Sequence, residues 1–349
     1  MHGDFFGWDI GGAHLKLASL DAEGRLLAVR QLACPLWRGL AQLERACAEL
    51  GVAAMAPRAV HAITMTGELC DVFIDRASGV RAILACLRRV LGAHADLRVY
   101  AGSAGWLSPV AAGAAATAVA SANWLALARW VATSAHDGLL LDIGSTTTDI
   151  ILIENGEVRC RGRDDATRLA CAELVYTGVV RTPVMAVCQR VPMQGAWQGL
   201  AAEYFATMAD VHRLLGQLAE DHDQMPTADG GGKLAADSAR RLARMLGRDF
   251  GVDASMAEMI GVARYIATAQ RRSIEDALAL QASRATCDAQ RLPVLGAGAG
   301  AFVAAQVAQA TTRGYRACAG LLGVAAGLAA QAELAAPAVA VAKLAWLAQ

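Results

Sequence analysis

A tight Asp-Ile-Gly turn between two apolar runs occurs twice in this chain, and the repetition constrains the fold more than any other feature. The longer copy lies in residues 139–158, where Asp142-Ile143-Gly144 and Ser145–Thr148 separate the two runs. The shorter copy lies in residues 7–18, around Asp9-Ile10-Gly11. Each copy predicts a strand, a tight turn and a second strand. Two such hairpins, one near the start of each half, predict two related lobes.

Both turns carry residue types that bind phosphate. Glycine lets the backbone approach a phosphate closely, and Lys16 can place a point charge on a phosphoryl oxygen. Aspartate at a strand end can hold hydrated Mg²⁺. A lone Asp-x-Gly would predict only an ordinary turn. The predicted phosphate-binding residues are Gly11, Gly12, Gly144, Ser145, Thr146, Thr147 and Thr148, with Asp9 and Asp142 as Mg²⁺ ligands through water.

A third glycine-rich turn follows a short apolar run near the C-terminus. Gly296, Gly298 and Gly300 alternate with alanine between an expected strand at 291–295 and an expected helix at 301–311. Such a turn presents backbone N–H groups to an anion or an adenosine moiety. Close packing of a helix on a strand also requires glycine, so this turn gains its weight from following the other two in order.

The order of the expected elements indicates α/β architecture with two lobes. Each lobe is expected to hold a mixed sheet flanked by helices, with a cleft between the lobes, as in actin-like ATPases. We expect the first lobe at 1–136, completed by C-terminal helices at 314–349, and the second at 137–313. The principal expected helices lie at 38–51, 79–93, 108–134, 169–178, 198–220, 235–247 and 255–283, and a further strand lies at 183–189.

The composition narrows the classes of function. The 349 residues include 32 basic and 32 acidic side chains, so the positive field of a general nucleic-acid or membrane-surface binder is missing. Nine scattered cysteines without zinc spacing predict reduced thiols in a cytoplasmic protein. The Ala-rich stretches near 107–135 and 317–348 carry polar interruptions and predict core helices. Small molecules are the expected partners, and a homo-oligomer stays open.

The motifs together resemble a known family. The three glycine turns are similar to those of the acetate/sugar kinase–Hsp70–actin superfamily. More narrowly, the chain resembles the hydantoinase A/oxoprolinase-related proteins linked to tetrahydromethanopterin-dependent C1 transfer. The segments that carry this resemblance are Trp8–Lys16, Thr64–Leu69, Asp142–Asp149, Tyr176–Pro183, Glu203–Asp210 and Pro226–Gly230. His14 stands where the family pattern has Asn.

The resemblance implies an activity in methanofuran biosynthesis. The implied enzyme is a transferase that joins an aminomethylfuran methyl diphosphate to the phenol of γ-glutamyltyramine and releases diphosphate. In this reading the phosphate turns hold the leaving diphosphate, Mg²⁺ is the expected cofactor, and ATP is not required. The residues expected to carry the chemistry are Asp9, Lys16, Glu68 and Asp142.

Further polar residues accompany the turns. Glu68 follows the expected strand 59–65 and could deprotonate or orient the phenol, with Asp71 as the second choice. Arg181 and Thr182 could bind phosphate or the glutamyl carboxylate. Residues 226–232 predict a mobile cover over a ligand. Glu203 and Asp210 are placed on one face of the helix expected at 198–220. Each also has a structural explanation, as a surface or helix-start residue.

Two other functions fit the same fold. An ATP-dependent kinase or amidohydrolase would hydrolyse ATP and use Gly296–Gly300 for adenosine. A non-enzymatic nucleotide-dependent switch would need an appendage or polymer-forming insert, which the sequence does not reveal. Turnover of ATP without the furan substrate would separate these alternatives from the transferase.

Overall fold

The computed structural model describes residues 3–52 and 58–349. The chain divides into two compact units, each made of separate segments. The first unit comprises Met1–Asp137, Ile153–Arg168 and Ala317–Gln349, and the second comprises Gly138–Leu152 and Leu169–Arg316. Each unit is described by itself.

The first unit is built on a six-stranded mixed sheet in the order β3-β2-β1-β4-β5-β6. The first hairpin pairs β1 and β2 antiparallel, while β1, β4 and β5 run parallel to one another. The carboxyl ends of these three strands therefore meet at one edge. The strands are β1 (Phe5–Ile10), β2 (His14–Leu20), β3 (Leu26–Ala33), β4 (Val60–Met65), β5 (Asp96–Tyr100) and β6 (Trp106–Leu107).

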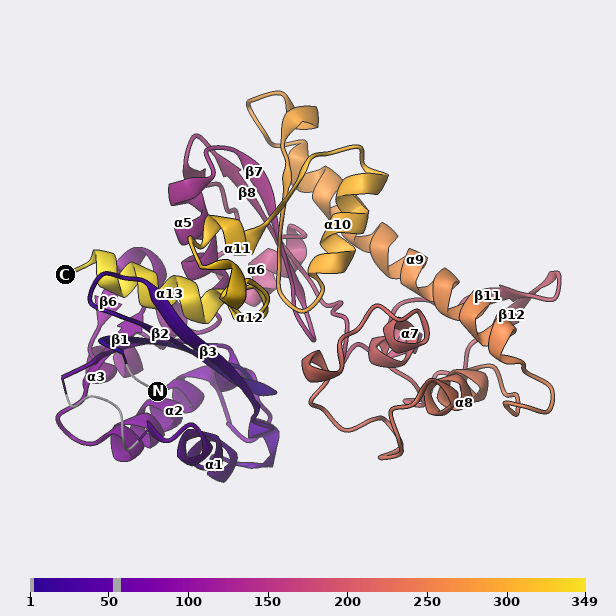
Figure 1. The fold of residues 1–349 in the computed structure, drawn as a ribbon, viewed down its shortest axis with the longest axis horizontal. Helices are drawn as coiled ribbons and strands as arrows, with labels where there is room; N and C mark the ends of the chain where they lie inside the picture. The colour runs from indigo at the N-terminus through magenta and orange to yellow at the C-terminus, as the bar shows by residue number, and fades with distance from the viewer. Residues whose placement is uncertain (1–2, 53–57) are drawn as a thin grey trace. The chain divides into compact units, whose positions relative to one another are not determined.

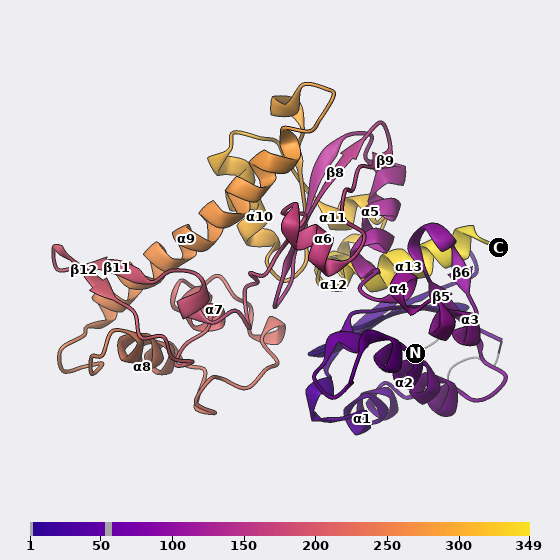
Figure 2. The same ribbon diagram turned by 180° about the vertical axis from the view of Figure 1, so that it is seen from behind.

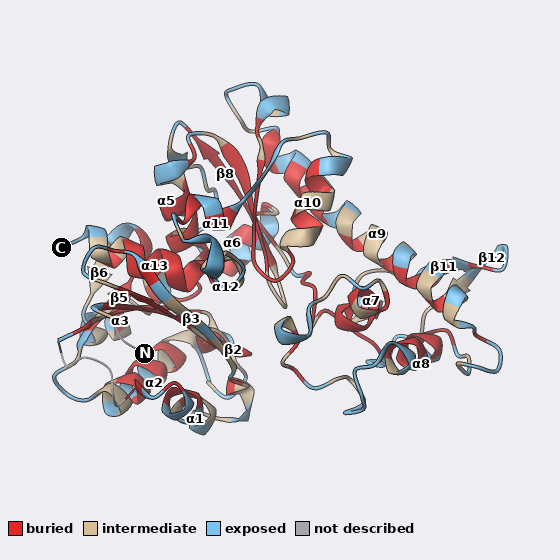
Figure 3. Ribbon diagram, viewed as in Figure 1, coloured by how far each residue is buried: buried red, intermediate tan, exposed pale blue. Residues whose placement is uncertain are grey.

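Helices cover both faces of this sheet (Figures 1 and 2). Helices α1 (Ala41–Glu49) and α2 (Arg76–Leu91) lie on one face, and α13 (Ala336–Leu347) lies on the other. A Cβ at Gly7 would lie 2.0 Å from the carbonyl oxygen of Ala338, so β1 needs glycine to admit α13. Figure 3 shows α13 buried along most of its length. The short helices α11 (Cys318–Leu321) and α12 (Ala329–Leu334) precede it.

The single helix expected at 108–134 is three helices instead. They are α3 (Pro109–Ala114), α4 (Ala116–Val119) and α5 (Asn123–Ser134). The break between α4 and α5 contains Ser121, whose φ of 51° is left-handed and ends a right-handed helix. The alanine-rich composition hid this break, which places the Ser121 side chain in the interior.

The second unit contains most of another mixed sheet, in the order β10-β8-β7-β13-β14, with β9 paired to β8. Strand β13 runs parallel to β7, as β4 does to β1 in the first sheet. Asn155 and Gly156 both have positive φ, as a two-residue hairpin turn between β8 and β9 requires. The strands are β7 (Gly138–Ile143), β8 (Thr148–Glu154), β9 (Glu157–Val158), β10 (Leu174–Val175), β13 (Val294–Ala297) and β14 (Tyr315–Ala317).

A helical region with its own apolar core follows β10 in the second unit. It contains α7 (Met208–Leu214), α8 (Ala235–Met245), the long α9 (Met256–Ala282) and the hairpin of β11 (Arg190–Met193) and β12 (Ala196–Gly199). The predicted start of α9 is confirmed, because Ser255 and Glu258 form a reciprocal capping box. Helices α6 (Asp165–Ala170) and α10 (Ala301–Ala310) complete the set.

Several expected elements around this region are wrong. Residues 169–178 form the end of α6 and β10, and residues 183–189 form a single 3-10 turn at Val184–Ala186. The helix expected at 198–220 begins only at Met208. The expected fold class is nevertheless confirmed: two mixed sheets, each flanked by helices.

Over residues 3–52 and 58–349, the structure has no single helix long and apolar enough to cross a membrane. The segments Ala326–Leu334 and Ala336–Leu347 meet the length and hydropathy requirement only together, across a bend of 107°.

Candidate functional site

The first glycine turn joins β1 to β2 and is fixed by backbone hydrogen bonds. The N–H of Gly11 donates to the carbonyl of His14 at 2.9 Å, and the carbonyl of Gly12 accepts from Leu36 at 2.9 Å. The hairpin register pairs Asp9 with Lys16, and Lys16 Nζ lies 3.8 Å from Asp9 Oδ2. The sequence-predicted residues Asp9, Gly11, Gly12 and Lys16 are therefore brought together.

Glu68 lies beside this turn because β4 ends next to β1. The N–H of Thr66 donates to the carbonyl of Ile10 at 3.0 Å, and Gly67 begins a 3-10 turn, Gly67–Leu69. A Cβ at Gly67 would lie 3.1 Å from the carbonyl oxygen of Ile10, so this approach is already tight. Asp71, the alternative to Glu68, is exposed.

The Glu68 side chain is 1% exposed and faces a second carboxylate across a serine. Glu68 Oε1 accepts from the backbone N–H of Ser121 at 2.8 Å and lies 3.1 Å from Ser121 Oγ. Asp165 Oδ2 lies 3.2 Å from the same hydroxyl and accepts from Arg76 Nη2 at 3.0 Å. One serine proton cannot serve both carboxylates, so the arrangement favours a proton on one of them.

Burial raises the pKa of Glu68 to about 7. The hydrogen bonds from Ser121 oppose this shift, and the charge of Asp165 adds to it. Among the residues that the structure describes, no group donates a hydrogen bond to the buried Oε2. A carboxyl with a pKa near neutrality can take up and release a proton at neutral pH.

Helix α2 holds Glu68 in place from the other side. A Cβ at Gly79 would lie 2.7 Å from the carbonyl oxygen and 2.8 Å from the Cα of Glu68. The start of α2 is fixed by a capping box between Asp75 and Ser78. The Glu68 backbone is thus clamped between α2 and the first turn.

The second turn joins β7 to β8 in the second unit. The N–H of Gly144 donates to the carbonyl of Thr147 at 2.8 Å, and Asp142 and Asp149 are both buried. Thr148 Oγ1 donates to the carbonyl of Thr177 at 2.6 Å. The second turn and loop 177–182 are therefore joined at the first residue of β8.

Loop 177–182 packs directly on this turn. The N–H groups of Val180 and Arg181 both donate to the carbonyl of Ser145, at 3.1 and 2.8 Å. A Cβ at Gly178 would lie 2.4 Å from the backbone nitrogen of Thr146. Arg181 Nη1 lies 3.5 Å from Thr146 Oγ1, and Thr182 Oγ1 lies 3.5 Å from the Thr146 carbonyl. The predicted group of Ser145–Thr148, Arg181 and Thr182 is thus one cluster.

The third glycine turn contacts the other side of β7. The N–H of Gly300 donates to the carbonyl of Ile143 at 2.8 Å. Gly298 has a φ of 82°, and a Cβ there would lie 2.5 Å from Asp142 Oδ1. Gly296 instead packs against the ring of Tyr315. Gly298 and Gly300 therefore join the second turn, whereas Gly296 supports the sheet behind it.

Helix α7 begins on loop 177–182, and its first acidic residue is structural. The N–H of Met208 donates to the carbonyl of Thr182 at 2.9 Å. Asp210, buried, accepts from the N–H of Thr207 at 3.1 Å and from Ser238 Oγ and Arg241 Nε, both at 2.8 Å. Glu203 lies outside the helix and is exposed. The expected pairing of Glu203 with Asp210 on one helix face is wrong.

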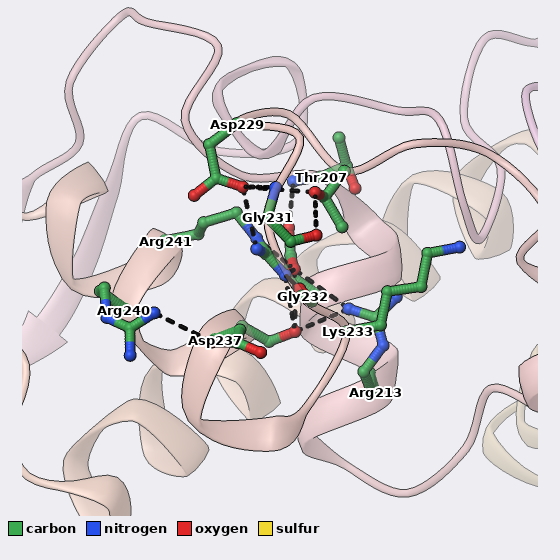
Figure 4. A network of polar contacts seen from close by, with 12 residues as sticks. Thr207, Arg213, Asp229, Gly231, Gly232, Lys233, Asp237, Arg240 and Arg241 are labelled. Atoms are coloured by element: carbon green, nitrogen blue, oxygen red, sulfur yellow. Dashed lines mark hydrogen bonds and ion pairs between the residues drawn. The ribbon is translucent and has the colours of Figure 1, made fainter.

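The glycine-rich loop 226–232 is tied to the same network (Figure 4). Asp229 accepts from Arg241 Nη1 at 3.0 Å. It also accepts from Arg244 Nη1 at 3.2 Å. Arg241 Nη2 also donates to the carbonyl of Gly232 at 3.0 Å. Lys233 lies 3.3 Å from Asp223, which in turn pairs with Arg213. These ion pairs hold the loop against α7 and α8, contrary to the expectation of a mobile cover.

Sequence reasoning missed the buried amide that supports loop 177–182. Gln270, in the middle of α9, donates from Nε2 to Thr177 Oγ1 and to the carbonyl of Gly178, both at 2.9 Å. Its Oε1 lies 2.9 Å from His212 Nε2, and burial lowers the pKa of His212. A glutamine within the apolar stripe of a long helix was the available signal. Ser121 and Asp165 gave no such signal, because they are distant in sequence from Glu68.

The donor sets fit magnesium only as a hydrated ion. Among residues 3–52 and 58–349, no group of three or more His, Cys, Asp or Glu side chains is placed to hold a metal. Mg²⁺ needs no such cage, since it keeps several waters and binds through one or two carboxylates and substrate phosphates. Asp9 in one turn and Asp142 in the other are buried carboxylates of that kind.

Comparison with known proteins gives the family. Residues 59–346 match the model of the family described as hydantoinase/oxoprolinase. The chain belongs to this family. The hydantoinase/oxoprolinase match spans the Glu68 cluster, the second and third turns and α13. The family expected from the motifs is thus confirmed.

Two curated proteins that are similar in sequence to this hydantoinase/oxoprolinase protein are named as synthases. It is 32% identical over 244 residues to the "(4-{4-[2-(gamma-L-glutamylamino)ethyl]phenoxymethyl}furan-2-yl)methanamine synthase" of Methanocaldococcus jannaschii, covering 70% of this chain and 71% of the relative. A protein of the same name from Methanococcus vannielii is 32% identical over 111 residues, which cover 32% of this chain and half of that relative.

One solved structure shares the fold at low identity. A nucleotide-free acetone carboxylase aligns over 85% of this chain and 65% of its own, with 13% identity and a TM-score of 0.51. A ROK family glucokinase from Streptomyces griseus aligns over 97% of this chain and 98% of its own, with 16% identity and a TM-score of 0.49. The likeness to the carboxylase concerns the fold alone.

Proposed function

We propose that this protein is a synthase that joins an aminomethylfuran methyl diphosphate to the phenol of γ-glutamyltyramine and releases diphosphate. The observation that carries the proposal is the 32% identity to the Methanocaldococcus jannaschii synthase over 70% of this chain. The product in that enzyme's name contains a phenoxymethyl link between a phenyl ring and a furan. Forming this ether bond is the step that the chain has to perform.

The proposed step is a substitution at the exocyclic carbon of the furan. The phenol oxygen forms the new C–O bond, the bond to diphosphate breaks with its electron pair on the leaving oxygen, and the phenolic proton passes to a base. Since the furan ring stabilises positive charge on this carbon, the enzyme's main task is to stabilise the leaving diphosphate. Donors aimed at that group would lower the barrier most.

The two glycine-rich turns support such a role, and the second also carries the hydroxyl groups of Ser145–Thr148. Lys16 stands beside Asp9 at the first turn, and Arg181 lies against the hydroxyl groups of the second. Asp9 in the first turn and Asp142 in the second are each suited to hold hydrated Mg²⁺, which would supply further positive charge toward a diphosphate. The third turn, through Gly298, keeps Asp142 in place.

Glu68 is the proposed proton acceptor, or the group that orients the phenol. Its pKa near 7 and its unpaired, buried Oε2 support this assignment. Ser121 orients the carboxyl through Oε1, and the close approach of α2 at Gly79 fixes the Glu68 backbone. Asp71 is exposed and lacks such support.

The test is to incubate the purified protein with the furan diphosphate and γ-glutamyltyramine, and separately with ATP. Diphosphate release that requires the phenol and is indifferent to ATP supports the proposal. ATP turnover in the absence of the furan would contradict it. Asp142→Asn should abolish the coupling while the far-UV circular dichroism is unchanged, whereas the exposed control Asp71→Asn should stay active.

A further inference from the structure

A cavity of about 390 Å³ lies in the first unit and is not part of either phosphate turn. This volume is within the usual range of small-molecule sites. Its lining includes the segment after β5, at Ala101–Ser103, the break between α4 and α5, and one face of α5. Residues 156–163, which include β9, complete the wall.

The cavity continues a series of features along one sheet edge. The adjacent parallel strands β1, β4 and β5 end there in the first glycine turn, in Glu68 and in the cavity wall, respectively. Met65, at the end of β4, forms a bridge with Ala120 of the cavity lining. In α/β sheets, ligands bind outside the carboxyl ends of the strands. The cavity therefore lies where a substrate of this unit is expected.

The Glu68 cluster borders the cavity. Ala120 and Ala122 both line it, and Ser121 between them holds Glu68 Oε1. The Trp124 ring, also in the wall, is fixed by the guanidinium of Arg168, whose Cζ lies 3.9 Å from the ring centroid. Alanine and tryptophan form a smooth apolar wall that suits a flat ring.

Charged groups line other parts of the wall. Arg129 donates from Nη1 to the carbonyl of Gly102 at 2.7 Å, which orients its guanidinium. Within the described part of the chain, neither Arg129 nor Arg163 forms an ion pair with a carboxylate, although both line the cavity. Glu157 adds one carboxylate to the lining. Two guanidinium groups without a carboxylate partner among the described residues favour a ligand with a carboxylate, and Glu157 can accept an ammonium group.

We propose that this cavity binds the phenolic substrate, with the ring toward Ala120 and Ala122 and the amino-acid end at Arg129, Arg163 and Glu157. The inference rests on the proposed function, since it assigns γ-glutamyltyramine to this place. The phenol ring at one end of this molecule matches the apolar part of the wall, and the zwitterionic amino acid at the other end, beyond an amide-containing linker, matches the charged part. In this orientation the phenol lies on the side of Glu68.

The test measures binding and turnover in the full chain with matched variants. Arg163→Ala removes an exposed guanidinium, and Ala132→Leu fills the cavity from α5. The control is Arg30→Ala, an exposed arginine on β3 at the opposite end of the same sheet. Calorimetry uses γ-glutamyltyramine and tyramine as probes, because tyramine lacks the carboxylate.

Arg163→Ala should raise the dissociation constant and the KM for γ-glutamyltyramine about 10-fold, because one charge-assisted contact is lost. Tyramine binding and the KM for the furan diphosphate should not change. Ala132→Leu should weaken the binding of both γ-glutamyltyramine and tyramine. Arg30→Ala should bind both as wild type does.

Wild-type affinity for γ-glutamyltyramine in both Arg163→Ala and Ala132→Leu would overturn the cavity assignment, even in a protein that makes the ether product. Conversely, a wild-type protein that binds γ-glutamyltyramine through Arg163 but forms no product would keep the cavity and refute the proposed function. The two proposals therefore fail by different results.

Discussion

Glu68 shows how burial and one shared hydroxyl can set the protonation of a carboxyl. Its side chain is enclosed by the 3-10 turn, α2 and Ser121, and its neighbour Asp165 is already paired with Arg76. The Glu68 carboxyl cannot ionise there without a cost in free energy, because its charge would be desolvated and would be repelled by Asp165. This places its titration close to neutral pH, where the proposed reaction needs a proton acceptor.

The same burial predicts a pH dependence of stability. The pKa of Glu68 is about 7 in the folded protein, against an ordinary value of 4.5. Between pH 4.5 and 7 the folded state therefore keeps a proton that the unfolded chain releases. Stability from the protonated form is therefore present below pH 4.5 and lost as the pH rises through 7. Glu68→Gln does not lose this stability. Its free energy of unfolding relative to wild type should therefore rise by about 2 kcal/mol between pH 5 and pH 8, measured by urea unfolding.

The control for this measurement is Glu49→Gln, the same substitution at an exposed position on α1. Glu68→Gln and wild type differing by a constant amount from pH 5 to 8 would show that Glu68 titrates normally.

Gly178 lies where close backbone packing leaves no room for a side chain. A Cβ there would lie 2.4–2.6 Å from three backbone atoms of Gly144–Thr146. Gly178→Ala must therefore displace loop 177–182 or the second turn, at a cost of about 1–3 kcal/mol. We expect lower stability and weaker binding of inorganic diphosphate by calorimetry. Gly199→Ala, where a Cβ meets nothing within 4 Å, should change neither.

At the scale of elements, α9 supports the second turn through a single amide. Replacing Gln270 with Leu leaves the Gly178 carbonyl, Thr177 Oγ1 and His212 Nε2 without that partner. We expect a loss of about 1–3 kcal/mol and faster hydrogen exchange at the amides of residues 179–181. Gln281→Leu removes an equally buried amide of α9, bonded to the Cys171 carbonyl. It should lower stability without changing exchange at 179–181; equal exchange in the two variants would contradict the role given to Gln270.

Arg241 joins three segments of the helical region: α7, α8 and loop 226–232. It is buried and pairs with both Asp210 and Asp229. Arg241→Met should destabilise by about 2–4 kcal/mol, because the buried Asp210 then keeps only Arg213 as a cationic partner among the described residues. Arg240→Met, next in sequence, removes only a surface pair with Asp237 and should cost under about 1 kcal/mol. Similar unfolding midpoints for the two variants would contradict this ranking.

The elements also show how far the sequence predicts the structure. The hairpins around Asp9 and Asp142 could be found because their signals are local: alternating apolar residues, glycine turns and Asn155-Gly156. The start of α9 was equally local, in Ser255 and Glu258. The conformation of residues 198–207 could not be predicted in this way, because it is set by backbone hydrogen bonds to β11 and α8. One example is the bond from the N–H of Ala201 to the carbonyl of Met245. No local pattern reports such partners.

The candidate site was predictable to the same degree. The members of each glycine turn are close in sequence, and the register of β1 with β2 brings Lys16 to Asp9. The environment of Glu68 could not be predicted, since Ser121 and Asp165 reach it through a helix break and a distant segment. The tie between Asp229 and Arg241 likewise required the packing of α8. Long-range packing, rather than residue type, decides these roles.

At the scale of the whole molecule, the first unit depends on the end of the chain. Removing Ala336–Gln349 deletes α13 and exposes the face of β1, β2 and β4 that it covers. We expect this truncation to abolish cooperative unfolding of the first unit, monitored by Trp fluorescence and hydrogen exchange of β1. Removing only Ala348 and Gln349, both exposed, should have no effect. Native exchange in β1 of the shorter chain would contradict the prediction.

The contact of Gly7 with Ala338 also has a consequence for synthesis on the ribosome. The polypeptide emerges from its N-terminus, so the opening hairpin leaves the exit tunnel more than 300 residues before the helix that seals it. The second unit, which ends at Arg316, is complete in the nascent chain while one face of the first sheet still lacks α13. The unit whose translation begins first is therefore the last whose packing can be completed.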